Sequence, residues 1–278
     1  MASAPSIEEK LRTWLASQGY PLELMVARHF QRTGALVVQS DYYSDPVTQE
    51  SREIDVVASW HDDIDRIFVR VSVLVECKAS RDKPWLLFSS PETRLAAPAR
   101  VAQRAGSQLA RLALREIAKN NEVQALPMFQ VPDCPAYGVR QGFAEKVDVC
   151  FAAISGVAAA AAAHSKLPDS QNSLLGRLDL LEIILPVVVT DARLFSVLLD
   201  AEGELEINER DSGVLLWRNP VVGLPHTIVH VVRSSSLPTF CEMISKSATD
   251  FLTMCRGPLR DVLLAARENR IHQRTLGK

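Results

Sequence analysis

Apolar residues recur along this 278-residue chain at two spacings, one typical of helices and one typical of strands. Within residues 6–33 the spacing is helical, and Gly19-Tyr20-Pro21 divides the segment into two predicted helices. Residues 52–58 and 73–78 are rich in β-branched and aliphatic residues, and the polar cluster 61–66 separates them. The pattern therefore predicts a helical N-terminus, a short strand at 35–39 and then a β-hairpin.

The rest of the chain alternates between proline-rich loops, helices and strands. Residues 81–97 are predicted to be irregular, with an apolar patch at 85–88 near the rim of any site that the hairpin forms. Pro98 predicts the start of a long helix that ends near Lys119, and a second helix is expected from Gly142 to His164. The remaining predicted elements are strands at 180–189, 194–199, 204–208, 213–218 and 227–232, and helices from Leu237 and after Pro258.

Three ionisable residues interrupt the apolar strands of the predicted hairpin. Asp55 lies in the first strand, and Glu76 and Lys78 lie in the second. Charged residues are rarely buried without a partner, so this placement indicates a site. The midpoint between positions 55 and 76 falls in the polar turn, so an antiparallel hairpin places Asp55 opposite Glu76, about 5 Å away. Glu76 and Lys78 share one strand face, and the pattern predicts a metal site with a lysine beside it.

The order of these features resembles the core of the PD-(D/E)xK nuclease superfamily. The shared order is a helix, a strand, the strand with Asp55, the strand with Glu76-Cys77-Lys78 and a basic helix, over about residues 20–120. The resemblance implies a mixed α/β (α+β) sheet with a restriction-endonuclease-like α-β-β-β-α-β core, helices at the N-terminus and a C-terminal extension of strands and helices. It also implies hydrolysis of phosphodiester bonds with Mg²⁺, which Mn²⁺ can replace.

The residues suit the chemistry that the resemblance implies. Mg²⁺ prefers oxygen ligands, which the carboxylates of Asp55 and Glu76 and the backbone carbonyl of Cys77 supply. Lys78 is expected to orient the attacking water or to stabilise the developing negative charge. Glu23, on the helix before the first strand, matches an additional glutamate of many members. It is expected to hold a water of the metal shell or a second metal.

Simpler roles also fit these residues. Asp55 is compatible with a strand end capped by nearby amides, and Glu76 and Lys78 are compatible with a plain ion pair. A glutamate in the first turn of a helix, such as Glu23, often only complements the helix dipole. Carboxylates of Asp55 and Glu76 held on opposite faces of the sheet would exclude the nuclease hypothesis.

Four arginines of the predicted helix from Pro98 to Lys119 fall on one side of it in a helical projection, within about 60° of one another. They are Arg100, Arg104, Arg111 and Arg115. Such a stripe is usually a solvent-exposed face, but beside a carboxylate site it also suits the phosphates of a nucleic acid. We therefore expect a nucleic-acid-binding surface on this helix.

Composition narrows the function classes. Apolar residues make up 47% and charged residues 23% of a chain with a formal net charge of −2, so any nucleic-acid contact must be local. The five cysteines include no C-x-x-C pair, so neither a disulfide framework nor a zinc site is expected. Residues 147–163 are rich in alanine and too short for a membrane span. We expect a buried helix there, no membrane contact and a cytoplasmic location.

A polar linker at 165–173 divides the chain into two predicted parts. Residues 1–164 are expected to form the nuclease-like core, and residues 174–278 to extend the same sheet. The leading hypothesis is a metal-dependent deoxyribonuclease of restriction, phage defence or repair. A catalytically inactive binding or scaffolding module and an RNA-directed nuclease remain as alternatives. Nucleic acid, DNA before RNA, is the expected partner, and a homo-oligomer or a partner protein that supplies specificity is a further possibility.

Overall fold

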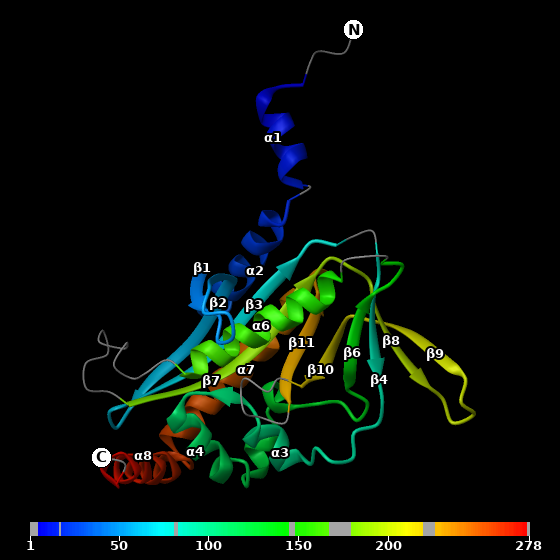
Figure 1. The fold of residues 1–278 in the computed structure, drawn as a ribbon. Coiled ribbons are helices and arrows are strands. Elements are labelled where there is room, and N and C mark those ends of the chain that lie inside the picture. Colours follow the sequence, from blue (N-terminus) through cyan, green and yellow to red (C-terminus); the bar gives the residue numbers. More distant parts are fainter. Residues whose placement is uncertain are drawn as a thin grey trace.

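The computed structural model describes residues 5–16, 18–80, 83–144, 148–166, 179–218 and 226–276. The strands of these ranges are β1 (Leu36–Ser44), β2 (Ser51–Ile64), β3 (Ile67–Lys78), β4 (Trp85–Ser89), β5 (Ala105–Gly106), β6 (Ala136–Gln141), β7 (Asp179–Thr190), β8 (Leu194–Leu199), β9 (Leu205–Arg210), β10 (Ser212–Trp217) and β11 (Thr227–Arg233). They form one mixed sheet of eleven strands in the order β1-β2-β3-β7-β11-β10-β6-β4-β8-β9, with β5 beside β7 (Figure 1).

Eight α-helices of the described ranges accompany this sheet. They are α1 (Ile7–Ala16), α2 (Tyr20–Arg32), α3 (Ala97–Ala102), α4 (Gln108–Ile117), α5 (Asn121–Gln124), α6 (Val149–Lys166), α7 (Leu237–Arg256) and α8 (Arg260–Leu276). Figure 1 shows α6 in front of β3 and β7, with α7 behind the sheet. The buried core is divided in the same way, because Val157 of α6 belongs to one apolar cluster and Phe251 of α7 and Phe30 of α2 belong to another. The protein is therefore a mixed α/β fold with the central strands covered on both faces.

The predicted hairpin is confirmed as β2 and β3. Its ladder runs from Ile64↔Ile67 at the turn to Val56↔Val75, which is the register that the sequence predicts. The two turn residues, Asp65 and Arg66, both have positive φ, at 49° and 66°. Such a two-residue turn matches the twist of the flanking strands and fixes their register. The hairpin therefore brings the end of β3 to the start of β2.

β3 pairs in parallel with β7 along its whole length, from Ile67↔Asp179 to Lys78↔Thr190. Every residue of β7 after Asp179 is buried, as expected for a parallel strand covered on both faces. β11 pairs in parallel with the far half of β7. β7 and β11, which follow the predicted linker, therefore lie in the middle of the sheet, and β7 is directly beside the hairpin.

The long helix predicted from Pro98 to Lys119 is wrong, because two helices and a short strand occupy this segment. Between α3 and α4, β5 pairs with the edge of β7, and Ser107 then caps α4 by accepting a hydrogen bond from the Ala110 N–H. A Cβ at Gly106 would lie 2.4 Å from the Glu182 carbonyl oxygen, so only glycine allows this approach. Gly106 and Ser107 therefore interrupt the helix, although the spacing of the apolar residues around them is helical.

Two other element predictions need correction. Residues 85–88 were expected to be irregular and to cover the rim of the site, but they form β4, in which Trp85 is completely buried. The helix expected from Gly142 begins only at Val149, where the Asp148 carboxylate accepts a hydrogen bond of 3.0 Å from the Cys150 N–H. β4 was missed because it has only five residues, and alternation over so short a segment does not distinguish a strand from an apolar loop.

α6 is the only helix of the described ranges that is long and apolar enough to cross a membrane. Half of this helix is buried inside the protein, against β3, β7 and their neighbours. A core helix packs in the same way, and a buried helix is what the alanine-rich sequence predicts here.

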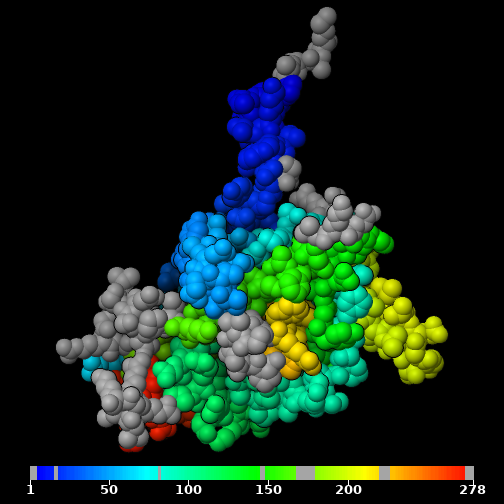
Figure 2. All heavy atoms as spheres, in the orientation of Figure 1, coloured from blue at the N-terminus to red at the C-terminus, as the bar shows by residue number. Residues whose placement is uncertain are grey.

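α1 differs from the other helices because it projects away from the body (Figures 1 and 2). Its apolar residues Ile7, Leu11 and Trp14 are 74%, 50% and 54% exposed. α1 is therefore outside the packed core of the described chain.

Candidate functional site

The site lies where β2 separates from β3. Their ladder ends at Val56↔Val75, so the next residue, Asp55, is no longer held by backbone pairing to β3. Its side chain takes over this role, because Asp55 Oδ2 accepts a hydrogen bond of 2.6 Å from the Cys77 N–H. Asp55 is therefore fixed at the end of β3 by the strand that it faces.

Glu76 and Lys78 are among the last three residues of β3 and lie beside Asp55. Lys78 Nζ donates a hydrogen bond of 2.6 Å to Glu76 Oε1, as expected for residues two apart on one strand face. The Glu76 side chain is 14% exposed and the Lys78 side chain 33% exposed. The pair is thus partly shielded from water but still open at the lysine.

The α6 side of the site is built around a glycine. A Cβ placed on Gly156 would lie 3.8 Å from Glu76 Oε2, so the glutamate packs against the helix backbone. The Tyr43 hydroxyl donates a hydrogen bond of 3.1 Å to the Gly156 carbonyl oxygen and ties β1 to α6 at the same point. Burial, followed by the charge of Glu76, raises the pKa of Tyr43 to about 12, so the phenol stays protonated.

Burial and, after it, neighbouring carboxylates raise the pKa values of the acidic groups. Burial raises the pKa of Asp55, and the Cys77 N–H and the Lys78 charge oppose this shift. Burial also raises the pKa of Glu76, and Asp55 and Glu23 add to the shift while Lys78 opposes it. Burial alone would lower the pKa of Lys78, but the charges of Glu76 and Asp55 and the hydrogen bond to Glu76 raise it. The site therefore concentrates negative charge around one ammonium group.

Glu23 belongs to the same electrostatic group. It lies in the first turn of α2, half-buried, and its pKa is raised by burial and then by the charges of Asp55 and Glu53. The structure thus brings Glu23 of α2 near Asp55 of β2, and no hydrogen bond links the two carboxylates.

The oxygen atoms of the site suit a hard cation such as Mg²⁺, but they do not form a complete side-chain cage. Within the described residues, no group of three or more His, Cys, Asp or Glu side chains lies close enough to hold one metal ion. Asp55 and Glu76 offer two carboxylates, and the extended backbone of Cys77 turns its C=O to the same edge as its N–H, toward Asp55. Two carboxylates, a carbonyl and several waters are a donor set that Mg²⁺ accepts.

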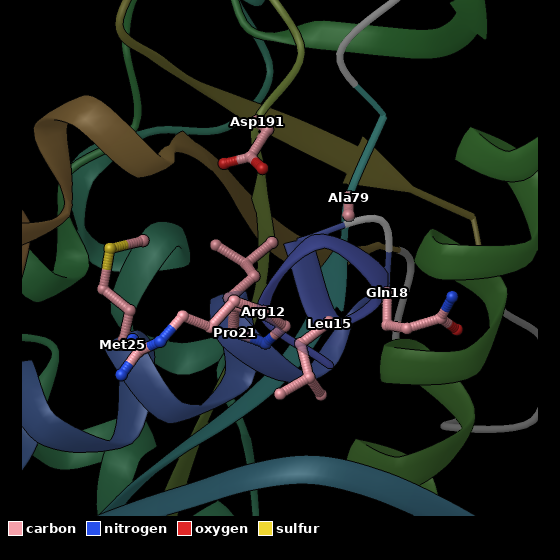
Figure 3. Close-up of a pocket in the computed structure, with 8 residues that line it drawn as sticks. Arg12, Leu15, Gln18, Pro21, Met25, Ala79 and Asp191 are labelled. Carbon is pink, nitrogen blue, oxygen red and sulfur yellow. The ribbon is translucent and has the colours of Figure 1, made fainter. Parts of the chain in front are cut away.

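A cavity of about 410 Å³ opens beside the end of β3 (Figure 3). Figure 3 shows Ala79, which follows Lys78, and Asp191, which follows the last residue of β7, facing Met25 and Pro21 of α2 across it. Sequence reasoning did not single out Asp191. Its signal is a carboxylate directly after a buried strand, but only the pairing Lys78↔Thr190 brings that strand end to the site.

The arginine stripe is not a continuous surface beside these carboxylates. Arg104 is 1% exposed and lies in the core, and Arg100 turns back to donate to the Leu95 carbonyl at 3.0 Å. Arg111 and Arg115 are exposed on α4, which follows the pairing Ala105↔Ile184, whereas the site lies beside Thr190. These two levels are about 20 Å apart along β7. The predicted stripe beside the site is therefore wrong, because it assumed one unbroken helix.

Comparison with protein-family models, curated proteins and solved structures finds no match for this chain. The function must therefore be inferred from the residues themselves and from their arrangement.

Proposed function

We propose that this protein is a metal-dependent nuclease that hydrolyses phosphodiester bonds, with DNA as the preferred substrate. The observation that carries the proposal is the convergence of Asp55, Glu76 and Lys78 at the point where β2 leaves β3. Two carboxylates held on one side of a strand end, with an ammonium beside them, are the groups that such hydrolysis requires.

The connectivity supports the same proposal. α2, β1, β2 and β3 come first, and α6 and β7 come later in the chain, after β4, α3, β5, α4, α5 and β6. β7 is parallel to β3, and α6 packs on the same face as Leu74 of β3. Without the intervening elements, this order resembles the α-β-β-β-α-β core of restriction-endonuclease-like proteins. In that core the chemistry occurs at the strand end that here carries Glu76 and Lys78.

Each residue then has a distinct task. Asp55 and Glu76 would hold Mg²⁺ together with the Cys77 carbonyl and waters. Such an ion would lower the pKa of a bound water and neutralise charge at the phosphate. Lys78 remains protonated at neutral pH because its acidic neighbours raise its pKa, so it can orient the attacking water or bind the developing negative charge. Glu23, whose charge acts on Glu76, would hold a water of the metal shell or a second metal.

A second candidate is a nuclease fold that binds nucleic acid without cleaving it. The observation that favours it is the incomplete side-chain cage, since the described residues offer only two close carboxylates to a metal. The presence of Asp55, Glu76 and Lys78 together counts against it, because inactive members of the nuclease superfamily commonly lose one of these residues.

The test is a cleavage assay with plasmid, linear duplex DNA, single-stranded DNA and RNA, each with Mg²⁺, with Mn²⁺ and with EDTA. Glu76→Ala, purified in parallel, controls for contaminating nucleases. We expect metal-dependent cleavage of at least one DNA substrate by the wild type only. Binding of DNA without cleavage in either metal would favour the binding module, and cleavage of RNA alone would change the substrate.

A further inference from the structure

Arg104, which is not used by the proposed chemistry, is an unusual cation. It lies between α3 and β5, is 1% exposed, and none of its three guanidinium nitrogens has a hydrogen-bond partner among the described residues. The Phe129 ring lies beside it, with its centroid 5.9 Å from the guanidinium carbon. Arg104 is therefore shielded from water without a hydrogen-bonded partner of opposite charge among the described residues.

The described residues around Arg104 provide no counter-charge. Burial lowers its pKa to about 9, and no acidic side chain of the described residues opposes this shift. The group is still protonated at neutral pH, because arginine keeps its charge in proteins. A buried charge without a partner costs several kcal/mol, so folded proteins pair such charges. A buried water could accept hydrogen bonds from the Arg104 guanidinium, but it would not neutralise the positive charge.

His230 of β11 is the second polar group at this place in the core. It is 6% exposed, its Nε2 also lacks a partner among the described residues, and its ring lies 5.8 Å from the Phe240 ring. Burial and then the charge of Arg104 lower its pKa to about 3, so its imidazole is neutral. Arg104 and His230 are thus two buried polar groups. The guanidinium nitrogens of Arg104 and Nε2 of His230 make no hydrogen bond within the described residues, and the charge of Arg104 acts on His230.

We propose that Arg104, with His230 Nε2 as a second donor, binds a compact inorganic anion such as chloride in the core. The site selects for small size, because both side chains are buried and each lies beside an aromatic ring. It selects for a single negative charge, because the one guanidinium of Arg104 carries a single positive charge. The inference is independent of the proposed nuclease activity.

The test is thermal unfolding in sodium chloride and in sodium gluconate at constant ionic strength. Gluconate is too large for an enclosed site, so it serves as the reference anion. A ligand that binds only the folded state raises Tm, by about 3 °C for each tenfold rise in concentration above its Kd in a protein of this size. We expect that rise in chloride and bromide and not in gluconate.

Arg104→Met tests the assignment and Arg111→Met is its matched control. Arg104→Met removes the buried charge and keeps an apolar side chain of similar length, so its Tm should not respond to chloride and should equal or exceed the wild-type value in gluconate. Arg111 is exposed on α4, so Arg111→Met should keep the wild-type response. Equal chloride responses in wild type and Arg104→Met would overturn the proposal.

A second measurement does not depend on the folding of any variant. Crystals of the wild-type protein grown in sodium bromide should give an anomalous peak within hydrogen-bond distance of the Arg104 guanidinium. Density for water or for a protein carboxylate at that place, without an anomalous signal, would overturn the proposal.

Discussion

Glu76 and Lys78 form an ion pair because residues two apart on a strand share a face, and Asp55 joins them because the hairpin register places it there. Each of these relations is local, and each could be read from the sequence. What the sequence does not contain is the end of the ladder at Val56, where the Asp55 side chain replaces the backbone as the partner of the Cys77 N–H. That replacement fixes the orientation of the carboxylate.

Lys78→Ala and Glu76→Ala should separate catalysis from metal binding. Lys78→Ala removes the proposed charge-stabilising group and leaves both carboxylates, so cleavage should fall about 10²–10⁴-fold while Mn²⁺ binding persists. Glu76→Ala should lose both, because it removes a ligand. Glu76→Ala should stay folded, since loss of one carboxylate relieves repulsion without metal. Lys78→Ala should stay folded because the side chain that it removes is one-third exposed at the edge of the core. Calorimetric Mn²⁺ titration and cleavage rates measure the two properties.

The matched control is Lys119→Ala, which removes a lysine whose side chain is 70% exposed in a surface pair with Glu116. It should cleave like the wild type. Full activity of Lys78→Ala would show that the lysine has no catalytic role.

Asp55→Asn should show how much the charged Asp55 carboxylate destabilises the metal-free protein, through the pH dependence of the free energy of unfolding. The pKa of Asp55 is raised in the folded state from its ordinary value of 3.8, so the folded protein binds this proton more tightly than the unfolded chain. Stability is therefore lost as pH rises from the ordinary value through the raised one. In EDTA, Asp55→Asn should be more stable than wild type at neutral pH, because asparagine still accepts from the Cys77 N–H without the charge.

Urea unfolding across a pH series measures this difference, which should shrink as pH falls into the carboxyl range. A variant less stable than wild type at neutral pH in EDTA would show that the Lys78 interaction outweighs burial at Asp55. Added Mg²⁺ should reverse the order at neutral pH, because only the carboxylate binds the ion strongly.

At the scale of elements, Gly156 of α6 decides how closely the helix approaches Glu76. A Cβ there would lie 3.8 Å from the Glu76 carboxylate, which is an ordinary contact. Gly156→Ala should therefore keep activity and stabilise the helix by about 0.5–1 kcal/mol. Gly156→Leu should displace Glu76 and lower cleavage by about 10²-fold, as small displacements of catalytic groups do. Cleavage rates and thermal unfolding of both variants test this, and a fully active Gly156→Leu would contradict it.

The elements were predictable where their signals are local. The five strands between residues 179 and 233 lie within about two residues of their predicted bounds, because alternation and turn residues mark them. The break in the helix expected from Pro98 was not predictable. The interruption at Gly106 and Ser107 is stabilised by the Leu180 and Glu182 backbone, over 70 residues away. The contact between Tyr43 and Gly156 spans 113 residues and left no local signal.

At the scale of the whole molecule, the C-terminal helices hold the hairpin from outside. Arg256 forms two hydrogen bonds with Asp62, and Arg260 forms two with Asp65 in the turn. Exposed pairs of this kind contribute little individually. Their effect is to orient α7 and α8 over the hydrophobic core that α7 closes with Phe251 and Ile244. The hairpin, the central strands and the last two helices therefore form a single packed unit.

This arrangement predicts that the protein unfolds in one step and that residues 1–166 do not fold alone. Such a fragment lacks β7, so β3 would lose its whole ladder from Ile67↔Asp179 to Lys78↔Thr190, and the core would lose α7. Deletion of residues 1–17 is the matched truncation, because α1 projects from the body and its removal should leave Tm nearly unchanged (Figure 1). Calorimetry should give equal calorimetric and van't Hoff enthalpies for the full chain and for this N-terminal deletion. A sigmoidal unfolding transition of the 1–166 fragment would instead establish it as an independent nuclease-like domain, with the C-terminal strands added to a sheet that is already stable.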